Sequence, residues 1–111
     1  MKGGMNQFLK QAQKMQQELA RVQAELANIT VEGTSGGGMV KVVANCHNQI
    51  LEVEIDPEVI DKEEKEMLQD LVAAAVNQAL ENAQKRAQEE MNKVSGGMLG
   101  NLPGGFNLPG M

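Results

Sequence analysis

The chain has 111 residues, of which 15 are acidic and ten are basic, so its formal net charge at pH 7 is −5. A single domain commonly takes about 100 to 200 residues, so this length excludes a multidomain enzyme. Hydrophobic residues make up 41% of the chain, but only two residues are aromatic. Because bulky aromatic side chains normally anchor a large solitary core, the composition predicts a small, helix-rich body that needs a partner.

Cysteine usage and hydropathy indicate the compartment. Cys46 is the one cysteine, so no intramolecular disulfide can form, and eight oxidisable methionines suit a reducing environment. The N-terminal residues contain no apolar stretch of signal length. The longest apolar run, residues 71–76, is far shorter than the about 20 residues that cross a bilayer. We therefore expect a cytoplasmic protein without a membrane segment.

A long helix is expected near the N-terminus. Apolar residues recur there at alternating steps of three and four, a pattern typical of a coiled-coil seam: Met5, Phe8, Ala12, Met15, Leu19, Val22, Leu26 and Ile29. Gly3 and Gly4 form a poor helix start, and Gly33 with the glycines at 36–38 stops the helix on the other side.

Two strands with alternating apolar residues follow, at residues 39–46 and 50–55, and the polar residues 45–49 between them predict a hairpin connection. Residues 29–32 form a possible third strand before a turn at Thr34 and Ser35. Together these segments predict a small antiparallel meander.

A second long helix is expected after Asp56 and Pro57, which end the sheet. Asp61 followed by Glu64 has the form of a helix N-cap with an acid in the first turn. Apolar residues then keep one face: Leu68, Leu71, Val72, Ala75, Ala79, Ala83, Ala87, Met91 and Val94. A helix over residues 62–94 would be about 50 Å long, so part of it must project from a small body. The alanines at steps of four allow another backbone to approach closely.

The domain is therefore expected to span residues 1–94. From Ser95 to Met111 six Gly, two Pro and a repeated Asn-Leu-Pro-Gly predict a flexible tail, 95–111. The tail is more hydrophobic than a linker requires, which leaves docking on a partner as the alternative to a disordered end.

The charges are distributed unevenly. Residues 1–21 carry a net charge of +3 and residues 51–70 a net charge of −7. If the two helices pack antiparallel with their apolar faces in register, Leu26 lies near Leu68 and Phe8 near Ala87, and both free ends share one tip. The lysines and arginines of both helices then meet at this basic tip: Lys2, Lys10, Lys14, Lys85, Arg86 and Lys93.

The residues alone leave two interpretations of these cations open. Lys10, Lys14 and Arg21 occupy outward positions where they can meet phosphates. Outward Lys and Arg are also often simply solvated, and the chain is acidic overall, whereas nucleic-acid-binding domains are usually basic.

Residues for catalysis or metal binding are not combined in a usable pattern. Cys46 and His47 are adjacent, but the sequence has no second Cys or His to complete a zinc site or activate a thiolate. The glycine-rich residues 33–38 lack the Gly-Lys-Ser/Thr ending of a phosphate-binding loop and lead into a strand, so they predict a turn. We expect no catalytic residues, no metal, no cofactor and no small-molecule substrate.

The order helix, Gly-rich turn, meander, long helix and Gly/Pro tail resembles the YbaB/EbfC family of bacterial nucleoid-associated proteins. Four segments carry the resemblance: Leu9-Lys-Gln-Ala-Gln-Lys-Met15, Val40-Lys-Val-Val-Ala-Asn45, Val53-Glu-Ile-Asp-Pro57 and Lys65-Glu-Met-Leu-Gln-Asp-Leu-Val-Ala-Ala-Ala-Val-Asn-Gln-Ala-Leu80. Each is weak alone, but their order and spacing together are specific. The resemblance covers nearly the whole chain.

The resemblance implies an α+β homodimer of α-β-β-β-α protomers, with a small antiparallel meander and two long helices that form a projecting arm. It implies that the arms spread like tweezers, bind duplex DNA and alter its conformation in nucleoid organisation or gene regulation, without enzymatic activity. The positions that fit DNA contacts on the arms are Lys10, Lys14, Arg21, Lys85 and Arg86. We expect a cytoplasmic, nucleoid-located protein that holds phosphates with weak sequence preference. The alternative is a protein-binding adaptor that uses its helical hairpin and apolar tail.

Overall fold

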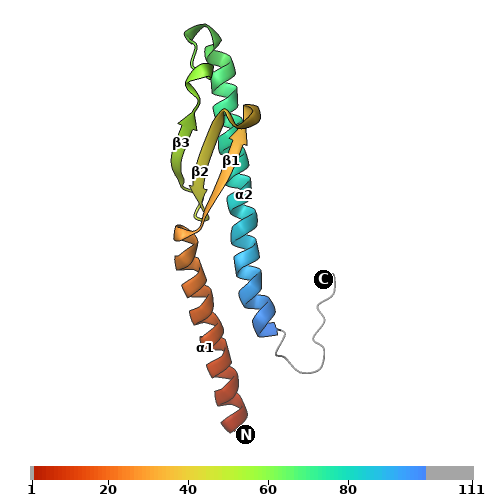
Figure 1. The fold of residues 1–111 in the computed structure, drawn as a ribbon. Coiled ribbons are helices and arrows are strands. Elements are labelled where there is room, and N and C mark those ends of the chain that lie inside the picture. Colours follow the sequence, from red (N-terminus) through yellow and green to blue (C-terminus); the bar gives the residue numbers. More distant parts are fainter. Residues whose placement is uncertain (1, 100–111) are drawn as a thin grey trace.

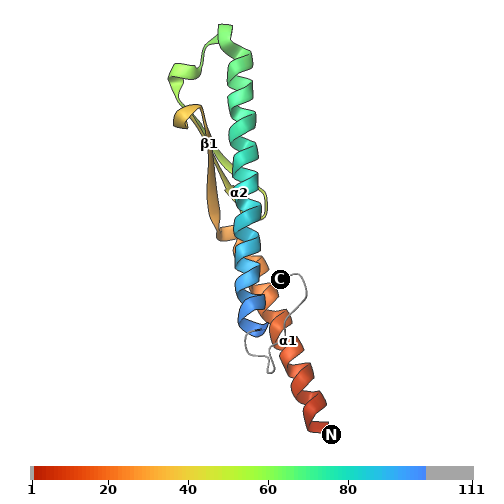
Figure 2. The same cartoon turned by 90° about the vertical axis from the view of Figure 1, so that its right-hand side faces the viewer.

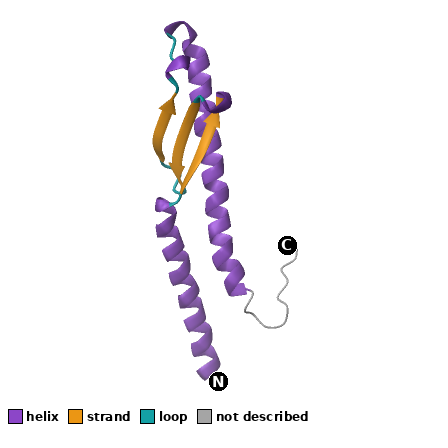
Figure 3. Ribbon diagram, in the orientation of Figure 1, coloured by secondary structure: helices purple, strands orange, loops and turns teal. Residues whose placement is uncertain are grey.

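The computed structural model describes the backbone of residues 2–99 and the side chains of residues 4–94. Helix α1 (Lys2–Glu25) leads through a 3₁₀ turn into three strands, β1 (Thr30–Ser35), β2 (Val40–Asn45) and β3 (Ile50–Ile55). Two further 3₁₀ turns precede the long helix α2 (Lys65–Leu99). Figure 1 and Figure 3 show an elongated molecule in which one helix lies beside the sheet and the other projects away from it. The α+β order and the three-stranded sheet confirm the sequence prediction.

The helix boundaries differ from the predicted ones at three places, the start of α1 and both ends of α2. α1 begins at Lys2 and includes Gly3 and Gly4 in its first turn. α2 continues through Ser95 to Leu99, five residues into the predicted tail. Residues 100–111, the rest of that tail, lie outside the described residues. The predicted cap is confirmed at Asp61, whose carboxylate accepts a hydrogen bond from the Glu63 N–H at 3.0 Å, but it caps the 3₁₀ turn of residues 62–64, and α2 begins after that turn, at Lys65.

The sheet is an antiparallel meander of order β1-β2-β3. The predicted turn at Thr34 and Ser35 is wrong, because both residues belong to β1 and pair with Lys41 and Val40 of β2. The reversal is made by the glycines at 36–38, all of which have positive φ, a conformation that other residues rarely adopt.

Asn45 ties the end of α1 to the β2–β3 hairpin. Its side-chain amide donates to the carbonyl of Ala27 at 3.1 Å and to Oε1 of Gln49 at 2.7 Å. Its Oδ1 accepts from the N–H groups of His47 and Gln49, each at 3.0 Å. A buried amide with every contact satisfied fixes the geometry around it, so this residue sets the place where α1 leaves the sheet.

The core lies between α2 and one face of β1 and β2. Val40, Val42 and Ala44 of β2 are fully buried against Ala75 and Ala79 of α2. At Gly33 of β1 the two backbones come so close that an added Cβ would overlap the Ala79 nitrogen and the Ala75 carbonyl oxygen. The alanine row therefore permits a close backbone approach, as its spacing predicts, but the element that approaches is β1 and not α1.

The predicted register of the two helices is wrong. Leu26 is buried in a second cluster with Val22 and Cys46, against which Ala87 and Met91 of α2 pack, whereas Leu68 packs on the sheet core. The first turns of α2 are occupied by the sheet, so only the last third of this helix reaches α1. Figure 1 and Figure 2 both show the N-terminal part of α1 running past the end of α2, and Phe8 is 70% exposed.

We expect Gly33→Ala to destabilise the fold by about 1 to 3 kcal/mol, because the methyl group would push β1 away from α2. Gly4→Ala is the matched control, since no atom lies near the added Cβ and alanine favours the helix by about 0.5 to 1 kcal/mol. Urea unfolding followed by circular dichroism measures both. Equal midpoints for the two variants would contradict the close packing.

Candidate nucleic-acid interface

α1 has a cationic face and an apolar face. Lys10, Lys14 and Arg21 recur at steps of four and seven residues, so their side chains leave one side of the helix, opposite the row that contains Phe8 and Val22. Toward the sheet the apolar row is buried at Val22 and Leu26. Toward the N-terminus Met5, Phe8 and Leu9 are exposed. In this single chain the predicted apolar row is therefore packed against other residues only at the end of α1 that adjoins the sheet.

Two lysines near the free end of α1 form no ion pair with the side chains that the structure describes. Among the described side chains, neither Lys10 nor Lys14 has a carboxylate oxygen within 4.0 Å, and the first acid of the sequence is Glu18. The last acid of α2 is Glu90, which pairs with Arg86 and Lys93 of its own helix. The charge of the two ammonium groups is therefore available to an anion.

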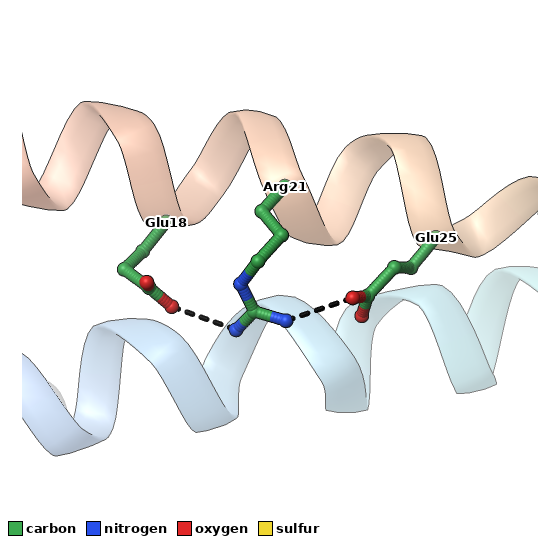
Figure 4. Close-up of polar contacts among 3 residues, drawn as sticks. All are labelled: Glu18, Arg21 and Glu25. Carbon is green, nitrogen blue, oxygen red and sulfur yellow. Dashed lines mark hydrogen bonds and ion pairs between the residues drawn. The ribbon is translucent and has the colours of Figure 1, made fainter.

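Arg21 is engaged within its own helix. Its guanidinium forms ion pairs with Glu18 at 2.7 Å and with Glu25 at 2.9 Å, and Figure 4 shows it between the two carboxylates. The hydrogen bond from Arg21 holds the pKa of Glu18 below its usual range. Both partners are exposed to solvent, so this cation can exchange carboxylates for phosphates at little cost.

The cations of α2 are paired in the same way. Lys85 contacts Glu81 at 3.4 Å, Arg86 contacts Glu90 at 3.1 Å, and Lys93 contacts the same oxygen of Glu90 at 3.2 Å. The hydrogen bond from Arg86, followed by the one from Lys93, lowers the pKa of Glu90, so this carboxylate is ionised at neutral pH. Glu90 thus neutralises part of the positive charge at this end of α2.

The single basic tip expected from the sequence does not form. Ala87 packs in the cluster of Leu26, which places Arg86 near the sheet end of α1. Lys10 lies 16 residues before Leu26, or about 24 Å along the helix at 1.5 Å per residue. The cations therefore form two groups in the same half of the molecule, one on the projecting part of α1 and one on the last third of α2. The side chain of Lys2 lies outside the described residues.

The acidic segment, residues 51–70, lies at the other end of the molecule. Residues 51–70, with their net charge of −7, run along β3 and into the start of α2, at the top of Figure 1, whereas the N-terminus of α1 lies at the bottom. The predicted separation of the acidic segment from the N-terminal lysines is therefore confirmed.

An open hollow of about 670 Å³ lies where α1, the hairpin and α2 meet. Its lining includes Cys46, whose thiol pKa is raised by burial, and His47, whose Nε2 lies 2.6 Å from the carbonyl oxygen of Gln23. Cys46 and His47 are the titratable side chains among the described residues that line the hollow, and no Asp, Glu, Lys or Arg accompanies them. Within residues 4–94, no three potential metal ligands lie close enough together to hold an ion.

The ion pairs were not predicted, although the sequence carries their signal. Glu18 and Glu25 stand three residues before and four residues after Arg21, and Glu90 stands four residues after Arg86. These are the spacings at which side chains on a helix meet. Lys93 was placed at the tip but was not counted among the DNA-binding positions; it shares Glu90 with Arg86.

Comparison with known proteins gives a consistent result. The sequence model of the YbaB/EbfC DNA-binding family matches residues 1–98. The nucleoid-associated protein TTE0040 of Caldanaerobacter subterraneus subsp. tengcongensis is 51% identical over 107 residues, covering 96% of this chain and 89% of the relative. A nucleoid-associated protein of Pelotomaculum thermopropionicum is 52% identical over 106 residues, covering 96% and 99%. The crystal structure of the uncharacterized protein HP0035 from Helicobacter pylori superposes with a TM-score of 0.58 at 23% identity, covering 70% of this chain and 90% of that one, which supports the fold alone.

The staggered helices can be tested by alanine substitutions at two seam positions of α1. We expect Leu26→Ala to destabilise the protein by about 2 to 5 kcal/mol, because Leu26 is only 5% exposed. We expect Phe8→Ala to change stability by less than about 0.5 kcal/mol, because Phe8 is 70% exposed. Thermal unfolding measures both, and a comparable loss for Phe8→Ala would favour helices aligned along their full length.

Proposed function

This chain belongs to the YbaB/EbfC DNA-binding family, and on that premise we propose that it is a nucleoid-associated protein that binds duplex DNA as a homodimer. The observation that carries the proposal is that Lys10 and Lys14, near the end of a projecting helix, have no carboxylate oxygen within 4.0 Å among the described side chains. Lys10 and Lys14 make the first contacts with the phosphates, and Arg21 follows by exchanging Glu18 and Glu25 for phosphate oxygens.

The spacing of these cations suits a phosphate backbone. From Lys10 to Arg21 is 11 residues, or about 16 Å along the helix, a length over which a duplex carries about ten phosphate charges at one per 1.7 Å of its axis. Lysine ammonium groups act as point charges and read no base sequence. The protein therefore binds DNA with weak sequence preference.

The second group of cations extends the contact toward the sheet. Lys85 and Arg86 reach phosphates only when they leave Glu81 and Glu90, so they join after α1 has engaged. In a dimer the two arms hold one duplex at separate points, and the duplex deforms to satisfy both, which alters its conformation.

Dimerisation and location complete the proposal. Large apolar side chains of β3 and of the segment after it are exposed in the single chain, among them Leu51, Val53 and Ile60, and a two-fold partner is the commonest way to cover such a surface. Over the described residues, none of the helices combines the length and the apolar character needed to cross a membrane. We place the protein at the nucleoid, in the cytoplasm, with a non-enzymatic role in nucleoid organisation or gene regulation.

One observation favours the alternative of a protein-binding adaptor. Met5 and Phe8 expose 71% and 70% of their surface on the face of α1 opposite the lysines, where they can contact another protein. This apolar face and the cationic face are separate, so a protein contact there is compatible with DNA binding on the other side.

We expect the double variant Lys10→Gln, Lys14→Gln to lower the affinity for random duplex DNA and to make its salt dependence weaker. Each lost phosphate contact changes the slope of log K against log salt by about 0.9, and the homodimer loses two contacts on each arm, so the slope should fall by about 3.6. Fluorescence anisotropy with a labelled duplex, repeated over a series of salt concentrations, measures both quantities.

The matched control is Lys62→Gln with Lys65→Gln, which removes the same two charges at the acidic end of the molecule. Its slope should equal that of the unaltered protein. If the two double variants behave alike, the assignment of Lys10 and Lys14 as phosphate ligands is wrong.

We expect Glu90→Gln to increase the affinity for DNA at low salt, because Arg86 and Lys93 lose the carboxylate that both contact. Glu66→Gln is the control, since it changes net charge equally but lies 24 residues away on α2. That is about 36 Å, well beyond the Debye length of about 10 Å at 0.1 M salt. The same binding assay should give a tighter complex for Glu90→Gln alone, and equal effects of the two variants would exclude a role for this end of α2.

A further inference from the structure

The exposure of the apolar row on α1 changes along the helix. The row keeps one face of α1 from Met5 to Leu26. Its residues are buried at Val22 and Leu26, half-buried at Met15 and Leu19, and exposed at Met5, Phe8 and Ala12. Met5 and Phe8 are as apolar as the buried members of the row. The exposure therefore follows the position along α1 and not the composition of the row.

The row is exposed where α2 has ended. Val94 of α2 packs against the cluster of Val22 and Leu26, and α2 continues for five residues beyond it, to Leu99. The two helices run in opposite directions in Figure 1 and Figure 2, so these five residues cover about 8 Å of α1 toward its N-terminus. Phe8 stands 14 residues before Val22, or about 21 Å along the helix. Phe8 therefore lies about 13 Å beyond the end of α2.

The chain that follows Leu99 has the length and the composition to cover this part of the row. Residues 100–111 contain no charged side chain, and their large apolar residues include Leu102, Phe106 and Leu108. Phe106 follows Leu99 by seven residues, which span at most about 25 Å when they are fully extended. This reach exceeds the about 13 Å that separate the end of α2 from Phe8 along α1.

We propose that residues 100–111 dock on the exposed end of the apolar row of their own chain, with Phe106 against Phe8. The contact continues the apolar seam in which α1 and α2 bury Val22. Lys10 and Lys14 leave α1 on the opposite side, so docking steadies the projecting arm and leaves both lysines free. The inference is independent of the homodimer and of DNA binding.

The covalent link favours this segment over a separate protein. A short linker holds the two surfaces at an effective concentration in the millimolar range, so a separate protein at micromolar concentration must bind about 1,000 times more tightly to compete. Two or three large apolar side chains bury enough surface for a contact of millimolar strength. Because the segment has no acidic side chain, it brings no carboxylate of its residues to Lys10 and Lys14.

Hydrogen exchange of the full chain, followed by mass spectrometry, tests the docking. In the double variant Leu102→Ser, Phe106→Ser we expect the amides of residues 5–15 to exchange about tenfold faster, because burial of a large apolar side chain favours the closed state by at least that factor. The contact lies beyond the packed end of α2, so it opens without the core and the midpoint of thermal unfolding should not change. Asn101→Ser with Asn107→Ser is the matched control in the same segment. Equal exchange of residues 5–15 in the two double variants would overturn the proposal.

Methyl NMR of the methionines distinguishes docking within one chain from docking on another. With Cys46 replaced by alanine, a spin label is attached through Gly105→Cys. When one chain carries both the spin label and ¹³C-methyl methionine and is diluted with an excess of unaltered protein, we expect the Met5 signal to lose intensity. The Met67 signal should keep its intensity, because Met67 lies 32 residues before Leu99, or about 48 Å along α2.

In a second sample the spin label and the ¹³C-methyl methionine are on different chains, and Met5 should keep its intensity. Loss of the Met5 signal in this sample, alone or as strongly as in the first, would place the segment on a second copy. Equal intensities of Met5 and Met67 in both samples would leave the row of α1 to another protein. Either result would overturn the proposal.

Discussion

The close contact between β1 and α2 determines the arrangement of the whole molecule. Because Gly33 has no side chain, the backbone of β1 can lie against Ala75 and Ala79. This contact fixes α2 over β1 and β2, where it buries Val40 and Val42 completely. A single helix can cover only about two strands of a sheet at this distance. The exposure of β3 is therefore a consequence of the same contact that builds the core.

The contact between β1 and α2 also determines which segments form the projecting arm. The sheet occupies the first two-thirds of α2, so only the segment around Ala87 and Met91 is left to meet α1. α1 must then extend past the end of its partner, and its lysines project into solvent away from the acidic end. The same stagger separates Lys10 from Arg86, so the cations form two groups. In the proposed function the group on α1 makes the first contacts with DNA.

The sequence was sufficient to predict the type and order of the helices and strands, but not all of their boundaries and not the helix register. Alternating residues at 39–46 and the apolar steps of three and four specify strands and helices through local geometry alone. The alanine row of α2 predicts that a backbone approaches closely, but its spacing does not say which one, and the answer depends on Gly33, more than 40 residues earlier in the chain. In the candidate nucleic-acid interface, the apolar row of α1 was enough to predict that Lys10, Lys14 and Arg21 lie on the opposite face of the helix. The pairing of Arg21 was readable from the positions of Glu18 and Glu25, but the distance between the two helices had to come from the fold.

The stagger of the helices is measured most directly by dipolar coupling between two spin labels. With Cys46 replaced by alanine, labels at Gln11 and Gln88 are attached through introduced cysteines, and labelled protein is diluted with an excess of unlabelled protein so that only distances within one chain contribute. Gln88 lines the hollow next to Leu26, and Gln11 lies 15 residues away along α1, so the separation should be about 20 to 30 Å. A separation near the about 10 Å between the axes of packed helices would show that α1 and α2 are aligned along their length, and would contradict the account.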